Sequence, residues 1–412
     1  MRDGSGRARA LTPSRTTRAA ALATVLFASS VIGACGADPT RSAPGTNDVG
    51  PADDPSPPLP LAPASAADLG AVVERVRAAH DLPAMGGAVV TADALVAFGV
   101  AGERRAGGPA VTAADRWHIG SNLKAVTAYL AGIAVDARMI DWEDTVAGSF
   151  PEMDVEEHYR EVTLRDLLSH GGGIPGSPPR GIATAADARG QRDQIVAWAL
   201  GQPPAAPRGI YHYSNVGYVT AGAMLERAYG TTYEAVIEAA LLAPLGVDGY
   251  GWGAQSAPGA SDAPVPHSLD GGAWIPCGGC DNPPWLSAAG RMHLPLGQWA
   301  TLVQEMIRAD DGDSTLLSAE TGALLSSGVI PIGDSGDRYG YGWLVTTRDW
   351  AGGRTLTHDG SNTLDHSVAW VSPARDVAFL AVTNAADLDG GRTARALDDL
   401  VGRLLEWFEA NG

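Results

Sequence analysis

The chain has 412 residues, of which 45% are hydrophobic and 6% are aromatic, a composition typical of a globular protein with a sizeable core. Its formal charge of −18 is not offset by any basic cluster, which argues against nucleic acid or an anionic membrane surface as a partner.

The first 34 residues have the pattern of a secretory signal peptide. Five arginines precede an apolar run from Ala19 to Ala34 that is short for a membrane span and ends in small residues. The run leads to Gly33-Ala34-Cys35, which resembles the lipobox of bacterial lipoproteins, where the cysteine is lipidated. We therefore expect an exported protein, either a membrane lipoprotein anchored through Cys35 or a periplasmic or extracellular one. An ordinary signal peptide with an incidental cysteine is the alternative.

The next segment, 35–64, is rich in Pro, Ala, Ser and Asp and has almost no large apolar residues. Such a composition cannot bury enough surface to fold, so it predicts a disordered tether. One folded domain is expected from residue 66 to residue 412.

Hydrophobic periodicity in this domain predicts a mixed α/β fold of the α+β type. Leu69, Val72, Val73 and Val76 recur at helical spacing, and the runs 87–91 and 95–100 read as a β-hairpin. Further helices are expected after Ser121, at 164–169, 185–200, 216–229, 233–242 and 298–309, and at 393–410; strands are expected at 339–347, 354–358, 367–371 and 377–383. Strands at both ends with helices between them predict one antiparallel sheet, built from N- and C-terminal segments and flanked by helices, plus a central helical domain.

The single lysine of the chain, Lys124, follows Ser121 by three residues, whereas every other basic residue is an arginine. A lysine amine can lose its proton when it is buried, but an arginine in a protein cannot. If Ser121 opens a helix, Lys124 lies on the same face one turn later and can reach the hydroxyl. An exposed surface lysine is the alternative.

A second polar motif, Tyr213-Ser214-Asn215, stands at the start of a predicted helix. A phenol held near an ammonium is biased toward phenolate and can act as a base, and an asparagine amide can bind a carbonyl or hold the lysine. Either residue could instead be structural, with Asn215 as a helix N-cap.

The third motif is His358-Asp359-Gly360-Ser361-Asn362, after a strand-like segment. On a strand His358 and Gly360 face the same side, so the glycine would leave room for a ligand beside an imidazole. The N–H of Ser361 could then join that of Ser121 in an oxyanion hole. A turn formed by Asp-Gly-Ser-Asn is the alternative.

Together and in this order, these motifs resemble those of the penicillin-recognising serine hydrolases, the family of class C β-lactamases, D,D-carboxypeptidases and esterases. The resemblance extends over residues 66–412. It includes Thr163-Leu164-Arg165-Asp166-Leu167-Leu168-Ser169-His170, similar to a T-x-x-D-L-L-x-H segment of the family, and Ser287-Ala288-Ala289-Gly290, similar to its glycine turn.

The resemblance implies a β-lactamase/transpeptidase-like fold and an acyl-enzyme mechanism. Ser121 would be the nucleophile, Lys124 and Tyr213 the base system, and Asn215 and His358 substrate contacts. Where β-lactamases of the family usually carry a lysine for the carboxylate of the drug, this chain has His358, largely neutral at pH 7. This favours an ester or a peptide over a β-lactam. A β-lactamase, or a non-catalytic binder or sensor of cell-wall peptides or β-lactams, is the alternative.

Cys277 and Cys280 lie in a Gly-, Pro- and Trp-rich stretch, where a local disulfide is expected for an exported protein. The nine histidines show no metal-ligand spacing, and no phosphate-binding glycine loop follows a strand, so no cofactor or metal is expected. The expected partner is a small-molecule or peptide substrate, and the sequence leaves the oligomeric state open.

Overall fold

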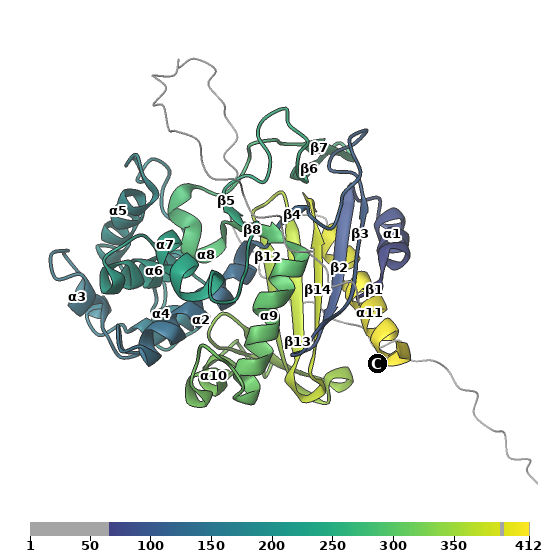
Figure 1. The fold of residues 1–412 in the computed structure, drawn as a ribbon. Coiled ribbons are helices and arrows are strands. Elements are labelled where there is room, and N and C mark those ends of the chain that lie inside the picture. The colour runs from purple at the N-terminus through teal and green to yellow at the C-terminus, as the bar shows by residue number, and fades with distance from the viewer. Residues whose placement is uncertain (1–65, 388–390, 412) are drawn as a thin grey trace, which may run out of the picture.

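The computed structural model describes residues 66–387 and 391–411, and its largest element is a nine-stranded sheet (Figure 1). Segments from the two ends of the domain meet in it, because β2 pairs with β14. Every pairing in the sheet is antiparallel except that of β1 with β3. Across the sheet, the strands are β1 (Ala67–Asp68), β3 (Leu95–Gly102), β2 (Ala84–Val90), β14 (Val377–Thr383), β13 (His366–Ser372), β12 (Gly353–Ser361), β11 (Leu344–Arg348), β10 (Arg338–Tyr339) and β9 (Ile330–Pro331).

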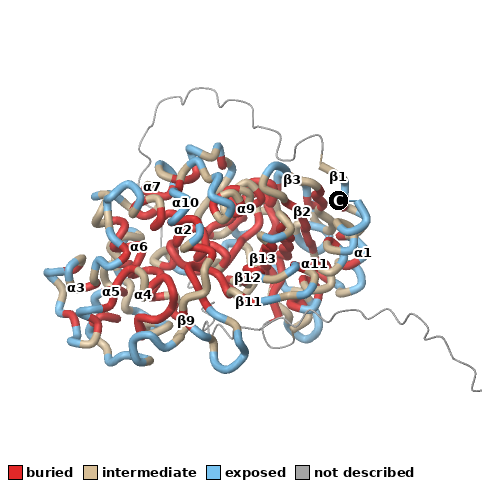
Figure 2. The backbone as a smooth tube through the Cα atoms, turned by 90° about the horizontal axis from the view of Figure 1, so that it is seen from below, coloured by how far each residue is buried: buried red, intermediate tan, exposed pale blue. Residues whose placement is uncertain are grey.

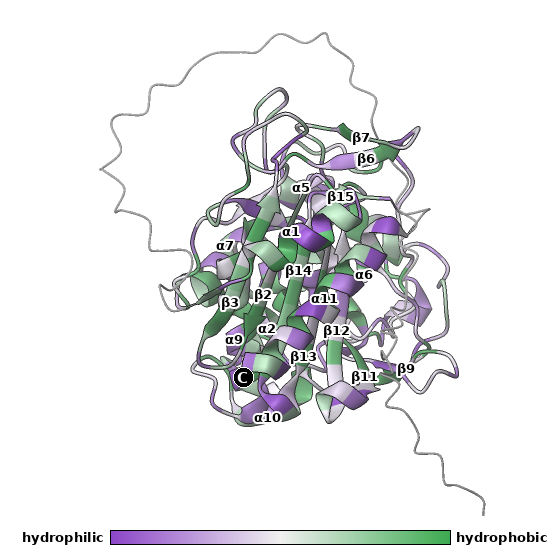
Figure 3. Cartoon of the chain, turned by 90° about the vertical axis from the view of Figure 1, so that its right-hand side faces the viewer, coloured by the Kyte–Doolittle hydropathy of each residue, from purple (hydrophilic) through white to green (hydrophobic). Residues whose placement is uncertain are grey.

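Helices cover both faces of this sheet. The first and last helices, α1 (Gly70–Ala79) and α11 (Arg392–Asn411), pack together on one face, over an apolar layer that is seen behind them in Figure 3. Gly87 of β2 lets α11 approach closely, since a Cβ there would lie 3.1 Å from Leu400. Helix α9 (Leu296–Asp311) covers the opposite face and belongs, with α2 (Leu123–Asp136), to the larger core cluster. The central strands are therefore buried on both sides (Figure 2).

The middle of the chain forms a helical region beside the sheet. Its elements are α3 (Val146–Ser149), α4 (Leu164–Leu168), α5 (Ala188–Leu200), α6 (Asn215–Tyr229), α7 (Tyr233–Ile237), a π-helical turn at Glu238–Leu242 and α8 (Ser287–Gly290). The remaining helix, α10 (Ala319–Leu325), packs against α9 and α2.

Two small three-stranded sheets complete the fold. One has the order β4 (Arg116–His118), β8 (Met292–Pro295), β5 (Gly251–Trp252), and the other has the order β15 (Ala385–Ala386), β6 (His267–Asp270), β7 (Ala273–Pro276). Strand β4 matters for the site, because the chain passes from it directly into the turn that carries Ser121.

The expected fold class is confirmed, whereas several boundaries differ from those expected. The strand expected at 339–347 is two strands, β10 and β11, because the chain between them passes against α2. Gly342 has a φ of +82°, and a Cβ there would lie 2.4 Å from the backbone of Ala125. The helix expected at 233–242 changes to π-helical geometry after Ile237.

The expected signal peptide, Cys35 and the tether lie outside the described residues. Within residues 66–387 and 391–411, no helix is both long and apolar enough to cross a bilayer.

Candidate active site

Ser121 lies in a single 3₁₀ turn, Gly120–Asn122, between β4 and α2. Gly120 has a φ of +49°, and a Cβ at this position would lie 2.3 Å from the backbone nitrogen of Ser361. Only glycine fits both the left-handed conformation and the close approach. The turn therefore places the hydroxyl of Ser121 ahead of α2 and its backbone next to the end of β12.

Lys124, in the first turn of α2, is completely buried. Its Nζ lies 2.9 Å from Ser121 Oγ, 2.8 Å from Asn215 Oδ1 and 2.7 Å from the carbonyl oxygen of Ala289. All three are neutral oxygens. Burial lowers the pKa of Lys124 well below its ordinary value, since desolvation disfavours the charged ammonium. The expected proximity of the amine to the hydroxyl is found, and the surface-lysine alternative is wrong.

A neutral amine fits these contacts with every hydrogen bond made. It has two N–H donors for the oxygens of Asn215 and Ala289, which can only accept, and one lone pair for the proton of Ser121. The hydroxyl is thereby aligned with a base.

Tyr213 approaches Ser121 from the helical region, and its hydroxyl donates to Ser121 Oγ at 2.8 Å. Burial raises the pKa of Tyr213 above its ordinary value, with the hydrogen bond to Ser121 acting in the opposite direction. The expected bias toward phenolate is therefore not found, because desolvation of the phenolate outweighs the nearby amine. In the free protein Tyr213 is a phenol that donates.

The N-cap of α6 is Ser214, whose hydroxyl accepts the N–H of Gly217. Asn215 is thus the first residue of the helix, and its side chain is free to hold Lys124 rather than to cap.

The residue His170 supports this wall of the site and was not among the expected site residues. Its Nδ1 accepts the N–H of Ser214 at 3.1 Å, and its ring lies 4.4 Å from that of Tyr213, centroid to centroid. Burial lowers the pKa of His170 well below its ordinary value. A neutral ring is what the accepted hydrogen bond requires. The T-x-x-D-L-L-x-H segment contained this signal, but only as a family feature.

His358 lies on β12 and is buried with its ring against Tyr339. Its Nε2 is 3.0 Å from Tyr339 Oη and its Nδ1 is 2.6 Å from the carbonyl oxygen of Asp359. Burial lowers the pKa of His358 to about 3. The imidazole is therefore neutral across the physiological range and already has a partner on each nitrogen. Contact between His358 and a substrate stays a prediction.

Strand β12 continues through Ser361, which pairs with His366 of β13, so the turn proposed as an alternative at Asp359–Asn362 does not form there. A Cβ on Gly360 would lie 2.0 Å from the carbonyl oxygen of Ile119. The glycine thus makes room for the Ser121 turn, and the expected space for a ligand beside it is filled by the backbone. This contact places Ser361 next to Gly120, as a shared oxyanion hole requires.

A groove of about 570 Å³ adjoins Asn215. Most of its wall comes from two segments, 177–183 and 281–286. Among the described residues that line it, Arg180 is the one cation. Its apolar lining comes from Pro178, Pro179, Ala183, Ile195, Pro283, Pro284, Trp285 and Leu286. The side chains that line this groove could not be predicted from the sequence, because they come together only in the tertiary fold.

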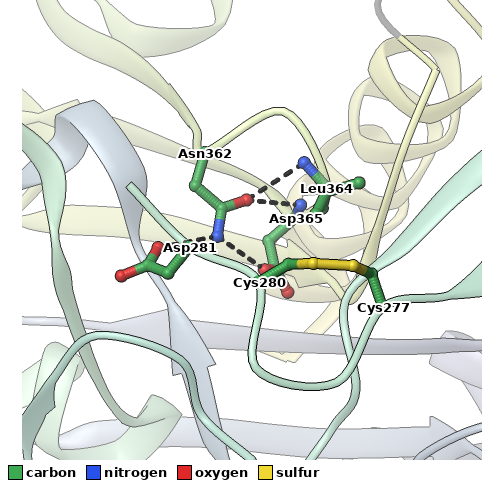
Figure 4. Close-up of a disulfide and its surroundings, with 6 residues drawn as sticks. All are labelled: Cys277, Cys280, Asp281, Asn362, Leu364 and Asp365. Carbon is green, nitrogen blue, oxygen red and sulfur yellow. Dashed lines mark hydrogen bonds between the residues drawn. A yellow bond between two sulfur atoms is a disulfide. The ribbon is translucent and has the colours of Figure 1, made fainter. Parts of the chain in front are cut away.

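Cys277 and Cys280 are joined by a disulfide with a Cα–Cα distance of 5.5 Å (Figure 4). Within the described part of the chain, no group of three or more His, Cys, Asp or Glu side chains could hold a metal ion.

The model of the family described as Beta-lactamase matches residues 69–403, which is most of the chain. The chain belongs to this family. Members of the beta-lactamase family are serine hydrolases, and Ser121, Lys124 and Tyr213 lie together as such chemistry requires.

Two named relatives have similar sequences. Penicillin-binding protein 4 of Amycolatopsis lactamdurans is 27% identical over 321 residues, covering 73% of this chain and 79% of the relative. An unguisins hydrolase of Aspergillus campestris is 26% identical over 302 residues, covering 67% of this chain but only 53%, about half, of the relative.

Solved structures share the fold. The octameric penicillin-binding protein homologue from Pyrococcus abyssi superimposes with a TM-score of 0.68 at 20% identity, covering 82% of this chain and 76% of that one. SurE superimposes with a TM-score of 0.67 at 22% identity, covering 82% and 75%.

Proposed function

We propose that this protein is an esterase- or D,D-peptidase-like hydrolase that cleaves an ester or amide through an acyl-Ser121 intermediate. One observation carries the proposal: Ser121 Oγ lies 2.9 Å from an amine that is completely buried among neutral oxygens. A non-catalytic binder would have no need for a buried lysine, with its pKa lowered well below the ordinary value, beside a serine.

In the acylation step, Ser121 Oγ forms a bond to the substrate carbonyl carbon while its proton passes to Lys124 Nζ. The carbonyl oxygen becomes an oxyanion, stabilised by the N–H groups of Ser121 and Ser361. Collapse of this intermediate breaks the bond to the leaving group, which takes a proton from Tyr213. The phenol is restored by the proton held on Lys124. A water molecule, activated by the same groups, then releases the acid and regenerates Ser121.

Substrate preference is the finer part of the proposal. The groove beside Asn215 is lined mainly by proline, tryptophan and aliphatic side chains, which suits an apolar group of the substrate. His358 is neutral and held by Tyr339, so it supplies no fixed cation for a β-lactam carboxylate. We therefore rank short esters and peptides with apolar residues above β-lactams.

The test is covalent labelling and turnover. The protein should be labelled by a fluorophosphonate at Ser121, as located by mass spectrometry of the modified peptide, and Ser121→Ala should abolish both labelling and hydrolysis. Near-normal hydrolysis by Ser121→Ala would refute the mechanism.

Turnover should be compared on p-nitrophenyl esters, nitrocefin and D-amino acid peptides. The peptide set should include D-Leu, because one solved structure with this fold is SurE with D-Leu. Nitrocefin turnover above ester turnover at pH 7 would overturn the ranking of substrates.

We further propose that the protein is exported, with lipidation of Cys35 as its anchor. The support is the signal-like segment and the lipobox-like residues before Cys35. Incorporation of radiolabelled palmitate that is lost in Cys35→Ala would support the anchor. A soluble, unlabelled product cleaved before residue 35 would replace it with ordinary secretion.

A further inference from the structure

Asp281 directly follows Cys280 (Figure 4) and is one of the residues that line the groove beside Asn215. Its Oδ1 is 2.9 Å from Nε2 of His118 and 3.1 Å from Nδ2 of Asn362. The side chains of His118 and Asp281 are 0% and 5% exposed. One buried oxygen atom therefore joins two segments that are far apart in the sequence.

The first of these segments carries the nucleophile. His118 is the last residue of β4, and its Nδ1 accepts the N–H of Gly120 at 3.0 Å. Because Nδ1 accepts, the proton of the neutral ring is on Nε2, the atom that lies 2.9 Å from Asp281 Oδ1. The orientation of this ring thus fixes the peptide unit just before Ser121.

The second segment carries the other proposed oxyanion donor. Asn362 follows Ser361, and its Oδ1 accepts the N–H groups of Leu364 at 3.0 Å and Asp365 at 2.8 Å (Figure 4). Its amide nitrogen also donates to Asp365 Oδ2 at 3.0 Å. Asn362 therefore connects the end of β12 to the loop that contains Leu364 and Asp365. Through Asp281 and His118 it is also connected to the Ser121 turn.

Asp281 directly follows a loop that is closed by the Cys277–Cys280 disulfide. The disulfide joins Cys280 to Cys277, whose N–H donates to the carbonyl oxygen of Pro266 at 2.8 Å. Arg291 Nε lies 3.7 Å from Asp281 Oδ2 and donates to the next residue, at the carbonyl oxygen of Asn282, at 3.1 Å. The carboxylate has little freedom to move away from His118 and Asn362.

We infer that Asp281 is a positioning residue, which sets the Ser121 turn and the Ser361 end of β12 relative to each other, and that the Cys277–Cys280 disulfide holds it in place. This inference rests on the acyl-Ser121 function proposed above. Nothing in it requires Asp281 to touch the substrate.

The electrostatics agree with this geometry. Burial acts to raise the pKa of Asp281, but its contact with His118 and the hydrogen bond from Asn362 lower it overall, so the carboxylate stays ionised. A buried carboxylate that loses its partners costs free energy. A movement of the Ser121 turn or of the Ser361 end of β12 away from Asp281 is therefore disfavoured.

The primary test is the rate of covalent labelling and of ester turnover in Asp281→Ala and Asp281→Asn. A displacement of about 1 Å in a catalytic group can cost on the order of 10²-fold in rate, so Asp281→Ala should lower kcat by that order with KM changed far less. Asp281→Asn keeps the shape and one acceptor oxygen, and it should recover much of the lost rate. If Asp281→Ala does not fold, Asp281→Asn and the His118 variants below decide the matter.

Two substitutions of His118 separate its two contacts. His118→Asn places an acceptor near the position of Nδ1 but does not reach Asp281, whereas His118→Gln reaches toward Asp281 but has no acceptor at the Nδ1 position. Both should lower kcat. The loss from His118→Asn should be non-additive with that from Asp281→Ala, because these two substitutions remove the same contact.

The matched control is Asp310→Asn. It removes the negative charge from the ion pair of Asp310 with Arg354, which lies at the opposite end of β12 from Ser361. It should lower stability but leave kcat unchanged. The Cys277→Ser/Cys280→Ser variant should slow labelling in the wild-type background and add little to Asp281→Ala.

The outcomes are distinguishable. If the wild-type protein is not labelled at Ser121, the proposed function fails. If it is labelled, and folded Asp281→Ala or the two His118 variants keep kcat within about twofold of wild type, the positioning role is overturned.

Discussion

Two fully buried basic side chains, Lys124 in the candidate active site and Arg192 in the helical region, have opposite electrostatic surroundings. Lys124 is held by a hydroxyl, an amide oxygen and a backbone carbonyl, and burial lowers its pKa well below the ordinary value. Arg192 is held by Glu226 and Glu234; burial acts to lower its pKa, but hydrogen bonds to the two glutamates raise it overall.

The contrast shows that burial alone does not make a base. Neutral acceptors hold an amine without stabilising its charge, whereas carboxylates stabilise the charge and turn the cation into a structural element. Residue type follows the same logic, because guanidinium is never deprotonated in a protein and the amine can be.

Replacing Lys124 should have the largest effect. Lys124→Arg introduces a permanent cation that cannot take a proton, so it should lower kcat by about 10²- to 10⁴-fold, nearly as much as Lys124→Ala. Turnover of a p-nitrophenyl ester measures this. Recovery of activity in Lys124→Arg would contradict this account, because Lys124 would then act through its positive charge, as Arg192 does, and not as a base.

Replacing Arg192 should damage stability instead of chemistry. Arg192→Met leaves Glu226 buried without its cation, and removal of one partner from a buried ion pair costs about 3–5 kcal/mol. Urea denaturation should report that loss. The kcat per folded molecule, counted by active-site labelling, should stay at the wild-type value; a fall in kcat would mean that the helical region also sets the chemistry.

Tyr213→Phe comes next in size. It removes the hydroxyl that donates to Ser121 and leaves the leaving group without its proton donor, so acylation should slow by about 10²-fold. Because the phenol is protonated in the free protein, the acid side of the pH profile should keep its midpoint. Single-turnover kinetics across pH would reveal a shifted midpoint if Tyr213 were instead the base.

The smallest effect concerns His358, a buried base that stays neutral without reacting. Its pKa is about 3 in the folded protein, below the ordinary value of 6.5, so the unfolded chain binds more protons between these two values. Stability contributed by this group is therefore complete above pH 6.5 and is lost as the pH falls toward 3.

His358→Gln should make stability fall less steeply over that interval, as measured by urea denaturation at several pH values. Binding of carboxylate ligands between pH 5 and 8 should not change through titration of His358. Stronger binding at the lower pH that disappears in His358→Gln would show that the imidazole charges within the site.

The sequence predicted the parts of the site that depend on local spacing. Ser121 and Lys124 are one helical turn apart, so their meeting follows from position and residue type, whereas the contact of Lys124 with Asn215, 91 positions away, needs the tertiary fold. The sequence did not predict that the pKa of Tyr213 is raised, because this shift depends on how deeply the phenol is buried between elements that are far apart in the chain. The same holds for His118 and Asp281, which are 163 positions apart, from 118 to 281, and which meet only through the tertiary fold.

Close backbone approaches were also beyond the sequence. Gly360 was expected to admit a ligand, but it admits the carbonyl oxygen of Ile119, and Gly342 breaks a strand because it passes against α2. A glycine in a strand indicates the close approach of another group, but only the tertiary structure shows whether that group is a ligand or the backbone.

Because the chain has a single lysine, the protonation state of Lys124 can be measured directly. Lysine labelled with ¹³C at Cε should give one side-chain resonance in the folded protein, and Lys124→Arg should remove it. We expect this resonance to titrate well below the ordinary lysine value and to move to that value on unfolding in urea. Titration of the folded protein at 10.5 or above would contradict the account, because Lys124 would then be a charged anchor and could not take the proton of Ser121.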